Sequence, residues 1–312
     1  MDGFDSGKVI NNFSIPDDYD PAVILAIGEK TISNEVDILK QSELNRLPIK
    51  EILFEEKFGS TSDILKEKNE LIKGNEMNKI IYRSEDRGKA NYGWLDTKYS
   101  FSFANYYNQD MMNFGLLRVL NNDIVEPGMG FGTHPHNNME IVTIILDGAL
   151  EHKDSMGTGS VIHKDEVQVM SAGSGITHSE FNPSQEEKVN LLQIWIFPKE
   201  KNIKPRYEQN SFPTDERKNK LVTAVSGLNK DGSLYIHQNA EINLGNFDKG
   251  QKTNYKLNNS VNGVYIYVID GQLSIADEEL FRRDAIGIYN TEEITIDTKE
   301  NSRFIIIEVP MN

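Results

Sequence analysis

From residue 77 onward, the sequence alternates between short runs of β-branched and aromatic residues and short stretches of turn-forming residues. The runs are about 5–8 residues long and end at Gly, Asp, Asn or Pro, as in GLLRVLNNDIVEPG, EIVTIILDGALEH, VNLLQIWIFP, GVYIYVIDGQLSIA and RFIIIEVP. Closely spaced strands of that length are typical of β-sandwiches and β-barrels. The pattern therefore predicts an all-β fold for this part of the chain.

Two similar hairpin signals divide the β-rich region. DGALEH at Asp147–His152 and DGQLSI at Asp270–Ile275 each place Asp-Gly before alternating residues, which is a strong signal for a tight hairpin. Their corresponding places predict two related β-domains in tandem, at 77–200 and 201–312. The segment Phe197–Pro213, which contains three prolines, would be the crossing between them.

Residues 1–76 read differently from the rest. Tyr19–Gly28 is an apolar run that ends at glycine and predicts one buried strand. Ser60–Glu76 is strongly charged and reads as a helix or a linker. One strand with little else cannot build a hydrophobic core alone, so we expect a short mixed extension in front of the β-domains.

Composition excludes several functions and compartments. A net charge of −15 opposes non-specific binding to nucleic acid or to an anionic membrane. The chain has no cysteine, which excludes disulfides and thiolate ligands, so any metal must be held by His, Asp or Glu. The start lacks a secretory signal, and no apolar run reaches the ~20 residues of a membrane helix. We therefore expect a cytoplasmic protein.

Histidine is scarce, at 6 in 312 residues, yet two histidines stand at positions i and i+2 in GFGTHPHNNMEI. Side chains at this spacing face the same way in a strand, so His134 and His136 would converge on one point. AGSGITHSEFN repeats the arrangement with His178 and Glu180. Pro135 lacks an N–H and predicts an edge strand or a bulge, and the glycines before each pair permit tight turns.

Two such strands facing one interior would supply three imidazoles and one carboxylate. This set suits iron, manganese, nickel, copper or zinc, and it leaves two positions of an octahedral ion free. A lone His-x-His is more often exposed or hydrogen-bonded than metal-bound. The second pair, His178 and Glu180, is what favours a metal site over that alternative. Glu140 is either a fifth ligand or, the reading we favour, a nearby partner for an imidazole N–H. The remaining histidines predict structural or exposed roles without catalysis: His152, His163 and His237.

The same residues match the two motifs of the cupin proteins. The first, GxxxxxHxHxxxE, is formed by Gly128, His134, His136 and Glu140. The second, GxxHxxxN, is formed by Gly175, His178 and Asn182. With DEVQVMSAGSGITHSEFN and LQIWIFP, the chain over about 77–312 resembles the pirin family, two-cupin proteins that include bacterial quercetin 2,3-dioxygenase-like proteins.

This resemblance implies an all-β fold of two tandem cupin barrels, also called double-stranded β-helices or jelly rolls. It implies one metal ion, usually iron, in the N-terminal barrel, and a C-terminal barrel that is metal-free. The ligands it implies are His134, His136, His178 and Glu180, whereas Glu140 is not a ligand. Asp165 and Arg283 stand where the family usually has glycine, and neither belongs to the implied site.

The N-terminal extension resembles a different family. FSIPDDYDPAVILAIG followed by NRLPIKEILFEEKFG, within residues 1–60, is similar to the C-terminal tail of a flavin-dependent nitroreductase. That resemblance implies a strand and a terminal arm without the flavin-binding body. We therefore expect no nitroreductase activity from residues 1–76. An extension unrelated to that family remains the alternative.

The resulting hypothesis is a mononuclear metal-dependent dioxygenase of the quercetin 2,3-dioxygenase type, which consumes O2 and a flavonol or similar enol-bearing aromatic. Fe(II) is the expected ion, and Mn, Ni, Cu or Zn are alternatives. The ion would act as a Lewis acid, and Glu180 would be both a ligand and, when displaced, the catalytic base. The alternative is a non-enzymatic, redox-sensitive regulatory protein with a protein partner. A substrate-sized pocket open to the ion would favour the enzyme, and the resemblance implies a monomer.

Overall fold

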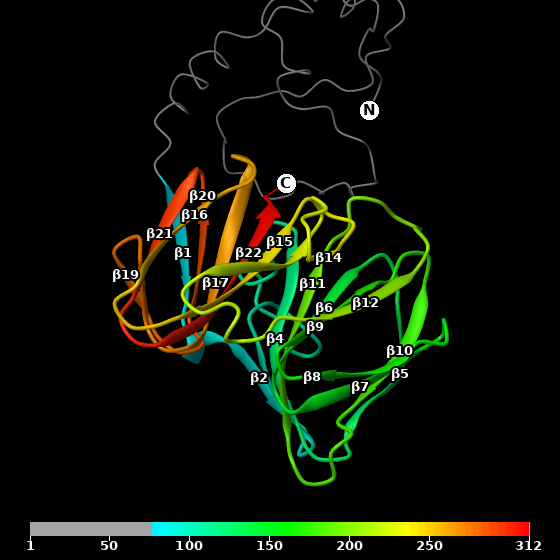
Figure 1. Cartoon of the computed structure of the whole chain (residues 1–312). Coiled ribbons are helices and arrows are strands. Elements are labelled where there is room, and N and C mark those ends of the chain that lie inside the picture. The colour runs from blue at the N-terminus through cyan, green and yellow to red at the C-terminus, as the bar shows by residue number, and fades with distance from the viewer. Residues whose placement is uncertain (1–76, 312) are drawn as a thin grey trace, which may run out of the picture. The chain divides into compact units, whose positions relative to one another are not determined.

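The computed structural model describes residues 77–311, which belong to one compact unit (Figure 1). These residues form strands connected by turns and a single 3-10 turn, η1 (Ser84–Asp86). No helix among them is long and apolar enough to cross a membrane. The strand expected at Tyr19–Gly28 and the nitroreductase-like segment lie outside the described residues.

Four sheets make up the fold, as two pairs of one seven-stranded and one four-stranded sheet. The first seven-stranded sheet has the order β12 (Arg206–Ser211), β9 (Glu166–Ser171), β6 (Glu140–Asp147), β11 (Val189–Ile196), β4 (Leu117–Val125), β3 (Leu95–Tyr99) and β2 (Gly88–Asn91). Its four-stranded partner has the order β5 (Gly130–His136), β10 (Ile176–Phe181), β7 (Ala149–Asp154) and β8 (Gly159–His163).

The second pair repeats this plan. Its seven-stranded sheet has the order β1 (Asn78–Tyr82), β20 (Ala285–Tyr289), β17 (Asn262–Asp270), β22 (Ser302–Pro310), β15 (Glu241–Phe247), β13 (Leu221–Ser226) and β14 (Leu234–Tyr235). The four-stranded sheet has the order β16 (Lys252–Lys256), β21 (Glu293–Thr298), β18 (Leu273–Ile275) and β19 (Glu278–Leu280). The all-β, tandem cupin architecture expected from the sequence is thus confirmed.

The two seven-stranded sheets pack against each other, and this contact explains the long apolar runs in the sequence. In β17, Val264 and Ile266 point into the second barrel, whereas Tyr265 and Tyr267 belong to the core shared by the two large sheets. A strand that is buried on both faces has no polar positions to alternate with. The apolar stretch GVYIYVI is therefore a central strand.

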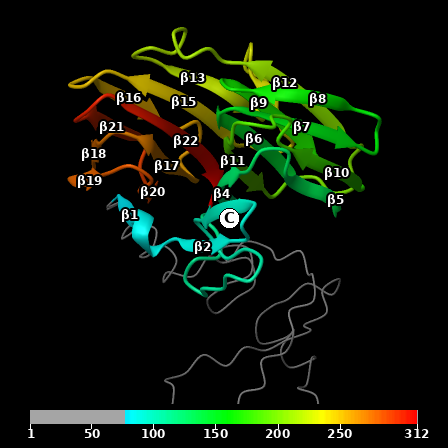
Figure 2. The same ribbon diagram turned by 90° about the horizontal axis from the view of Figure 1, so that it is seen from below.

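The two sheet systems exchange strands at their borders. β1 precedes the first barrel in sequence but pairs antiparallel with β20 of the second, as Figure 2 shows. Conversely, β12 follows residue 200 but pairs antiparallel with β9 of the first barrel. The domain division at 77–200 and 201–312 stays a prediction, and the strand pairing adds that each barrel takes an edge strand from beyond that border.

Asp165 and Arg283, at which the resemblance implied glycine, both have left-handed backbones, with φ of 66° and 72°. Asp165 has side-chain partners there, because its Oδ1 accepts a 2.8 Å hydrogen bond from Thr214 Oγ1 and pairs with the guanidinium of Arg217. Arg283 Nη1 is buried and has no hydrogen-bond partner among the described residues. The side chain of Asp165 thus has partners that offset the backbone strain, whereas Arg283 adds an unsatisfied buried donor to the same strain.

We expect Arg283→Gly to raise the free energy of unfolding by about 0.5–1 kcal/mol, because glycine removes the left-handed penalty of roughly 1–2 kcal/mol while gaining unfolded-state entropy. The midpoint of urea denaturation measures this change. Asp165→Gly is the matched comparison, and it should lower stability because the contacts with Thr214 and Arg217 are lost. A destabilised Arg283→Gly protein would contradict the strain argument.

Candidate metal centre

The two histidine pairs lie on neighbouring antiparallel strands. β5 carries His134 and His136 and is the edge strand of its sheet, as Pro135 predicts. β10 lies beside it and places His178 directly opposite His134. The register shifts between His178 and Glu180, so that an irregularity in the ladder, rather than simple alternation, sets the position of the carboxylate.

The three histidines converge as predicted. The His134 and His178 ring centroids are 4.4 Å apart, and the His136 ring lies 4.9 Å from each of the other two. Ligand atoms of all three lie within 4.8 Å of one another. Glu180 lines the same cavity as His134 and His136, and its closest grouping is with His178 and a further histidine, His152.

Burial keeps two of these imidazoles, those of His136 and His178, neutral. Burial, reinforced by the neighbouring imidazoles, lowers the pKa of His178 to about 2. Burial and His134 lower the pKa of His136 to about 4. The neutral ring is the form that binds a metal. His178 Nε2 is also buried without a hydrogen-bond partner among residues 77–311, and an ion beside this atom would satisfy it.

The Glu180 carboxylate is held in an environment that disfavours its ionised form. Glu180 is 3% exposed, and burial, with a further contribution from the Asp123 charge, raises its pKa to about 7. Gln193 Nε2 opposes the shift from 3.4 Å to both carboxylate oxygens. A positive ion would stabilise the ionised form far more than this amide does. The donor set therefore fits a divalent metal ion.

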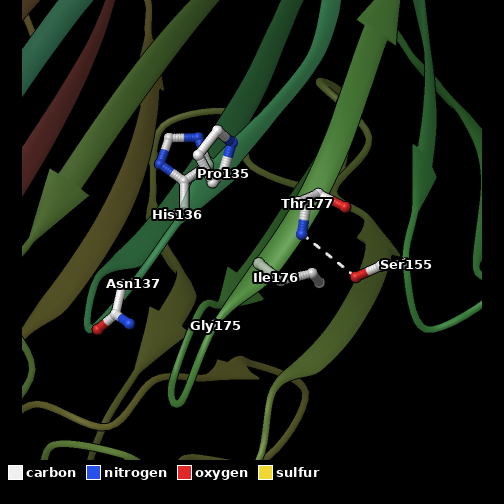
Figure 3. Close-up of a pocket in the computed structure, with 7 residues that line it drawn as sticks. All are labelled: Pro135, His136, Asn137, Ser155, Gly175, Ile176 and Thr177. Atoms are coloured by element: carbon white, nitrogen blue, oxygen red, sulfur yellow. Dashed lines mark hydrogen bonds between the residues drawn. The ribbon is translucent and has the colours of Figure 1, made fainter.

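Two hollows meet at His136. An inner cavity of about 190 Å³ is lined by Phe103, Asn121, Asp123, Phe131, His134, His136, Glu180, Gln193 and Trp195. An open depression of about 470 Å³ is lined by Pro135, His136, Asn137, Ser155, Gly175, Ile176 and Thr177 (Figure 3). Because His136 lines both, the candidate centre has an open side.

Gly130 keeps β5 close to β10 below the histidines. A Cβ on this residue would lie 2.2 Å from the Glu180 carbonyl oxygen and 2.5 Å from Phe181 Cα. Gly132 is two residues further along the same strand, and a Cβ there would meet nothing within 4 Å. Glycine is therefore required at position 130 for a tight approach of two backbones.

Gly130→Ala should destabilise the protein by about 1–3 kcal/mol, the usual cost of forcing extra volume into packed structure. It should also weaken metal binding, because the clash displaces Glu180 itself. Gly132→Ala is the matched control and should change neither property. Urea denaturation and nickel titration of both variants give the measurement, and equal behaviour of the two would refute the close-approach argument.

Glu140 lies away from the histidine cluster, so it is neither the fifth ligand nor the partner of a clustered imidazole that its spacing suggested. Glu140 shares its face of β6 with Val142 and Ile144, which belong to the core between the two large sheets. Its Oε2 accepts a 2.7 Å hydrogen bond from Ser171 Oγ, and burial raises its pKa. Thr143, on the opposite face, is the β6 residue that contacts Gln193. The even positions of β6 therefore point away from the histidines.

The other three histidines differ in their burial and in their distance from the cluster. His163 is exposed, and His237 is half-buried on the segment after β14, outside the histidine clusters of the described chain. His152 is fully buried and its ring centroid lies 5.2 Å from that of His178. Its structural role was expected, but its place directly behind a candidate ligand was not.

Sequence reasoning also missed the residues that surround the four candidate metal ligands. Gln193 and Trp195 face the cavity from β11, and Phe103 packs edge-on against Trp195 at 5.3 Å. The glutamine inside the apolar run VNLLQIWIF could have indicated a polar position at the site, because Gln193 and Trp195 stand two residues apart and share one face of the strand. His152 and Asp154 also stand at i and i+2, the spacing that identified the other pairs.

Paired sheets of this topology with a histidine cluster in the first pair define a tandem cupin protein with a candidate metal centre. The sequence model of the family described as Pirin matches residues 82–196, and that of the quercetinase C-terminal cupin domain matches residues 223–309. The chain belongs to the pirin family.

Known relatives agree with this assignment. A quercetin 2,3-dioxygenase of Escherichia coli (strain K12) is 40% identical over 233 residues, which cover 74% of this chain and 99% of the relative. A pirin-like protein of Caulobacter vibrioides is 38% identical over 222 residues, covering 71% and 95%. The crystal structure of the bacterial pirin YhhW from Escherichia coli in complex with nickel(II) has a TM-score of 0.71 and 39% identity, covering 75% and 99%.

Proposed function

We propose that this pirin-family protein is a metal-dependent dioxygenase in which His134, His136, His178 and Glu180 hold one divalent ion. The observation that carries the proposal is the convergence of three imidazoles and a buried carboxylate beside an open depression. The names of the relatives give the substrate class, a flavonol or a similar enol-bearing aromatic. Fe(II) is our choice of ion, although the same ligands accept nickel and other divalent metals.

The bound ion would supply Lewis acidity toward the substrate hydroxyl and a binding position for O2. The chain's own contribution begins with Glu180, whose buried carboxylate lines the inner cavity and would be the base that takes the hydroxyl proton. Gln193 holds this carboxylate in place.

Aromatic side chains would orient a flat substrate. Phe103, Phe131 and Trp195 form apolar walls of the inner cavity. Trp195 also has a buried indole N–H without a hydrogen-bond partner among the described residues, which is available to a substrate oxygen. The cavity of about 190 Å³ is smaller than pockets that enclose drug-sized ligands. A flavonol would therefore place its enol end inside and the rest in the outer depression.

The test is aerobic turnover of quercetin by protein loaded with Fe(II) under anaerobic conditions. We expect quercetin loss and O2 consumption in equal amounts, and neither with metal-free protein. Stoichiometric metal without consumption of quercetin or related flavonols would overturn the enzymatic proposal and favour the regulatory alternative.

A further inference from the structure

A row of buried polar side chains runs from His178 away from the cavity. Nδ1 of His178 lies 3.3 Å from Nδ1 of His152, and Nε2 of His152 lies 3.1 Å from Oδ2 of Asp154. The side chains of His152 and Asp154 are both 0% exposed. The phenol ring of Tyr207 packs over His152 at 4.8 Å between centroids. These two side chains are therefore shielded from solvent water.

The loop between β7 and β8 fixes Asp154. Its Oδ1 accepts hydrogen bonds from the backbone N–H groups of Met156 and Thr158, at 2.9 and 3.0 Å. The same loop is tied to β10, because Thr177 N donates to Ser155 Oγ at 3.2 Å and Ser155 N donates to Thr177 O at 2.9 Å (Figure 3). The carboxylate is thus held in one orientation beside the strand that carries His178.

Along this row, only one assignment of hydrogen-bond donors and acceptors satisfies every residue. An ionised carboxylate only accepts, so Nε2 of His152 must donate to Asp154. A neutral His152 then has a lone pair on Nδ1, which can only accept from His178. His178 must therefore carry its proton on Nδ1, and its buried Nε2, which has no partner in the described part of the chain, keeps a free lone pair.

We propose that Asp154 and His152 are positioning residues that fix the tautomer of His178, and thereby select Nε2 as its ligand atom. The inference rests on the proposed metal centre and deepens it. His134 shows the same arrangement with a simpler partner, because its Nδ1 lies 2.8 Å from the backbone carbonyl oxygen of Gly132. An outer partner that orients a ligating histidine in this way typically controls 10–100-fold in metal affinity.

The variant Asp154→Asn tests the direction of the row. The two backbone N–H groups will retain the amide oxygen, so the amide NH2 must face His152 and turn Nε2 into an acceptor. His152 then donates from Nδ1, and His178 is forced to protonate Nε2, the atom required by the metal. Calorimetric titration with nickel(II) should show affinity reduced by about 10–100-fold. Asp147→Asn, an exposed aspartate of the preceding hairpin strand, should bind nickel as the wild type does.

The double variant His152→Phe/Asp154→Asn separates positioning from simple damage. Phenylalanine keeps the packing on Tyr207 but cannot donate, so His178 is released from the wrong tautomer. Nickel affinity should return to within about tenfold of wild type, a coupling that independent structural losses would not produce. Two results overturn the proposal: Asp154→Asn binds nickel as tightly as wild type, or the double variant binds more weakly than Asp154→Asn.

Nitrogen-15 NMR of the metal-free proteins reads the tautomers directly. We expect His178 to be protonated on Nδ1 in the wild type and on Nε2 in Asp154→Asn. If the wild type binds no nickel but the tautomer changes as expected, the metal proposal fails and the positioning relay stands. An identical His178 tautomer in both proteins overturns the relay, whatever the metal does.

Discussion

Replacing His136 by alanine should yield a folded protein that has lost its metal and its turnover. His136 is one of three clustered imidazoles and lines both the inner cavity and the outer depression. Its loss removes a ligand and opens the centre to water. We expect nickel affinity to fall by more than about 100-fold, beyond the 10–100-fold typical of an outer partner, and flavonol consumption to become undetectable.

Metal analysis after gentle purification and nickel calorimetry measure this effect. His163→Ala is the matched control, because His163 is exposed and lies outside both histidine clusters of the described chain. It should keep the metal content and turnover of the wild type. Full metal content or full turnover in His136→Ala would refute the four-ligand assignment and, with it, the proposed mechanism.

Glu180→Gln should stabilise the metal-free protein at alkaline pH. Burial raises the pKa of Glu180 from 4.5 to about 7, so the folded wild type binds more protons than the unfolded chain between these values. Its stability contribution is therefore lost as pH rises through that window. Glutamine carries no charge, and its advantage should grow to about 3 kcal/mol at pH 8 and vanish below about pH 4.5. The histidine contributions are common to both proteins and largely cancel.

Saturating nickel(II) should reverse the order at pH 8, since an ionised carboxylate is a much stronger ligand than an amide oxygen. Urea denaturation at several pH values, with and without nickel(II), gives the comparison. Glu186→Gln, at an exposed glutamate in the loop after β10, should show neither effect. A metal-free Glu180→Gln protein less stable than wild type at pH 8 would show that the carboxylate is not held at an energetic cost.

Local periodicity predicted the all-β fold and the common direction of His134 and His136, whereas the tandem cupin fold and the four-residue ligand set were expected from the family resemblance. Alternation at i and i+2 brings His134 and His136 to one point, and the apolar runs predict the strands. The prediction that Glu140 partners an imidazole was wrong, because its distance from the histidines in sequence does not show which face of β6 it occupies. Asp154 was missed because its role depends on the β7–β10 pairing and on two backbone N–H donors in a turn. Such partners become visible only when strands distant in sequence are placed side by side.

The exchange of β1 and β12 between the barrels has a consequence for how the molecule comes apart. Removing either barrel would strip an edge strand from the other and leave a row of unpaired backbone groups exposed to other chains. Opening one barrel also uncovers the apolar face that it shares with the other. We therefore expect the two barrels to unfold together, so that opening the barrel that carries the candidate metal centre would require the second barrel to open as well.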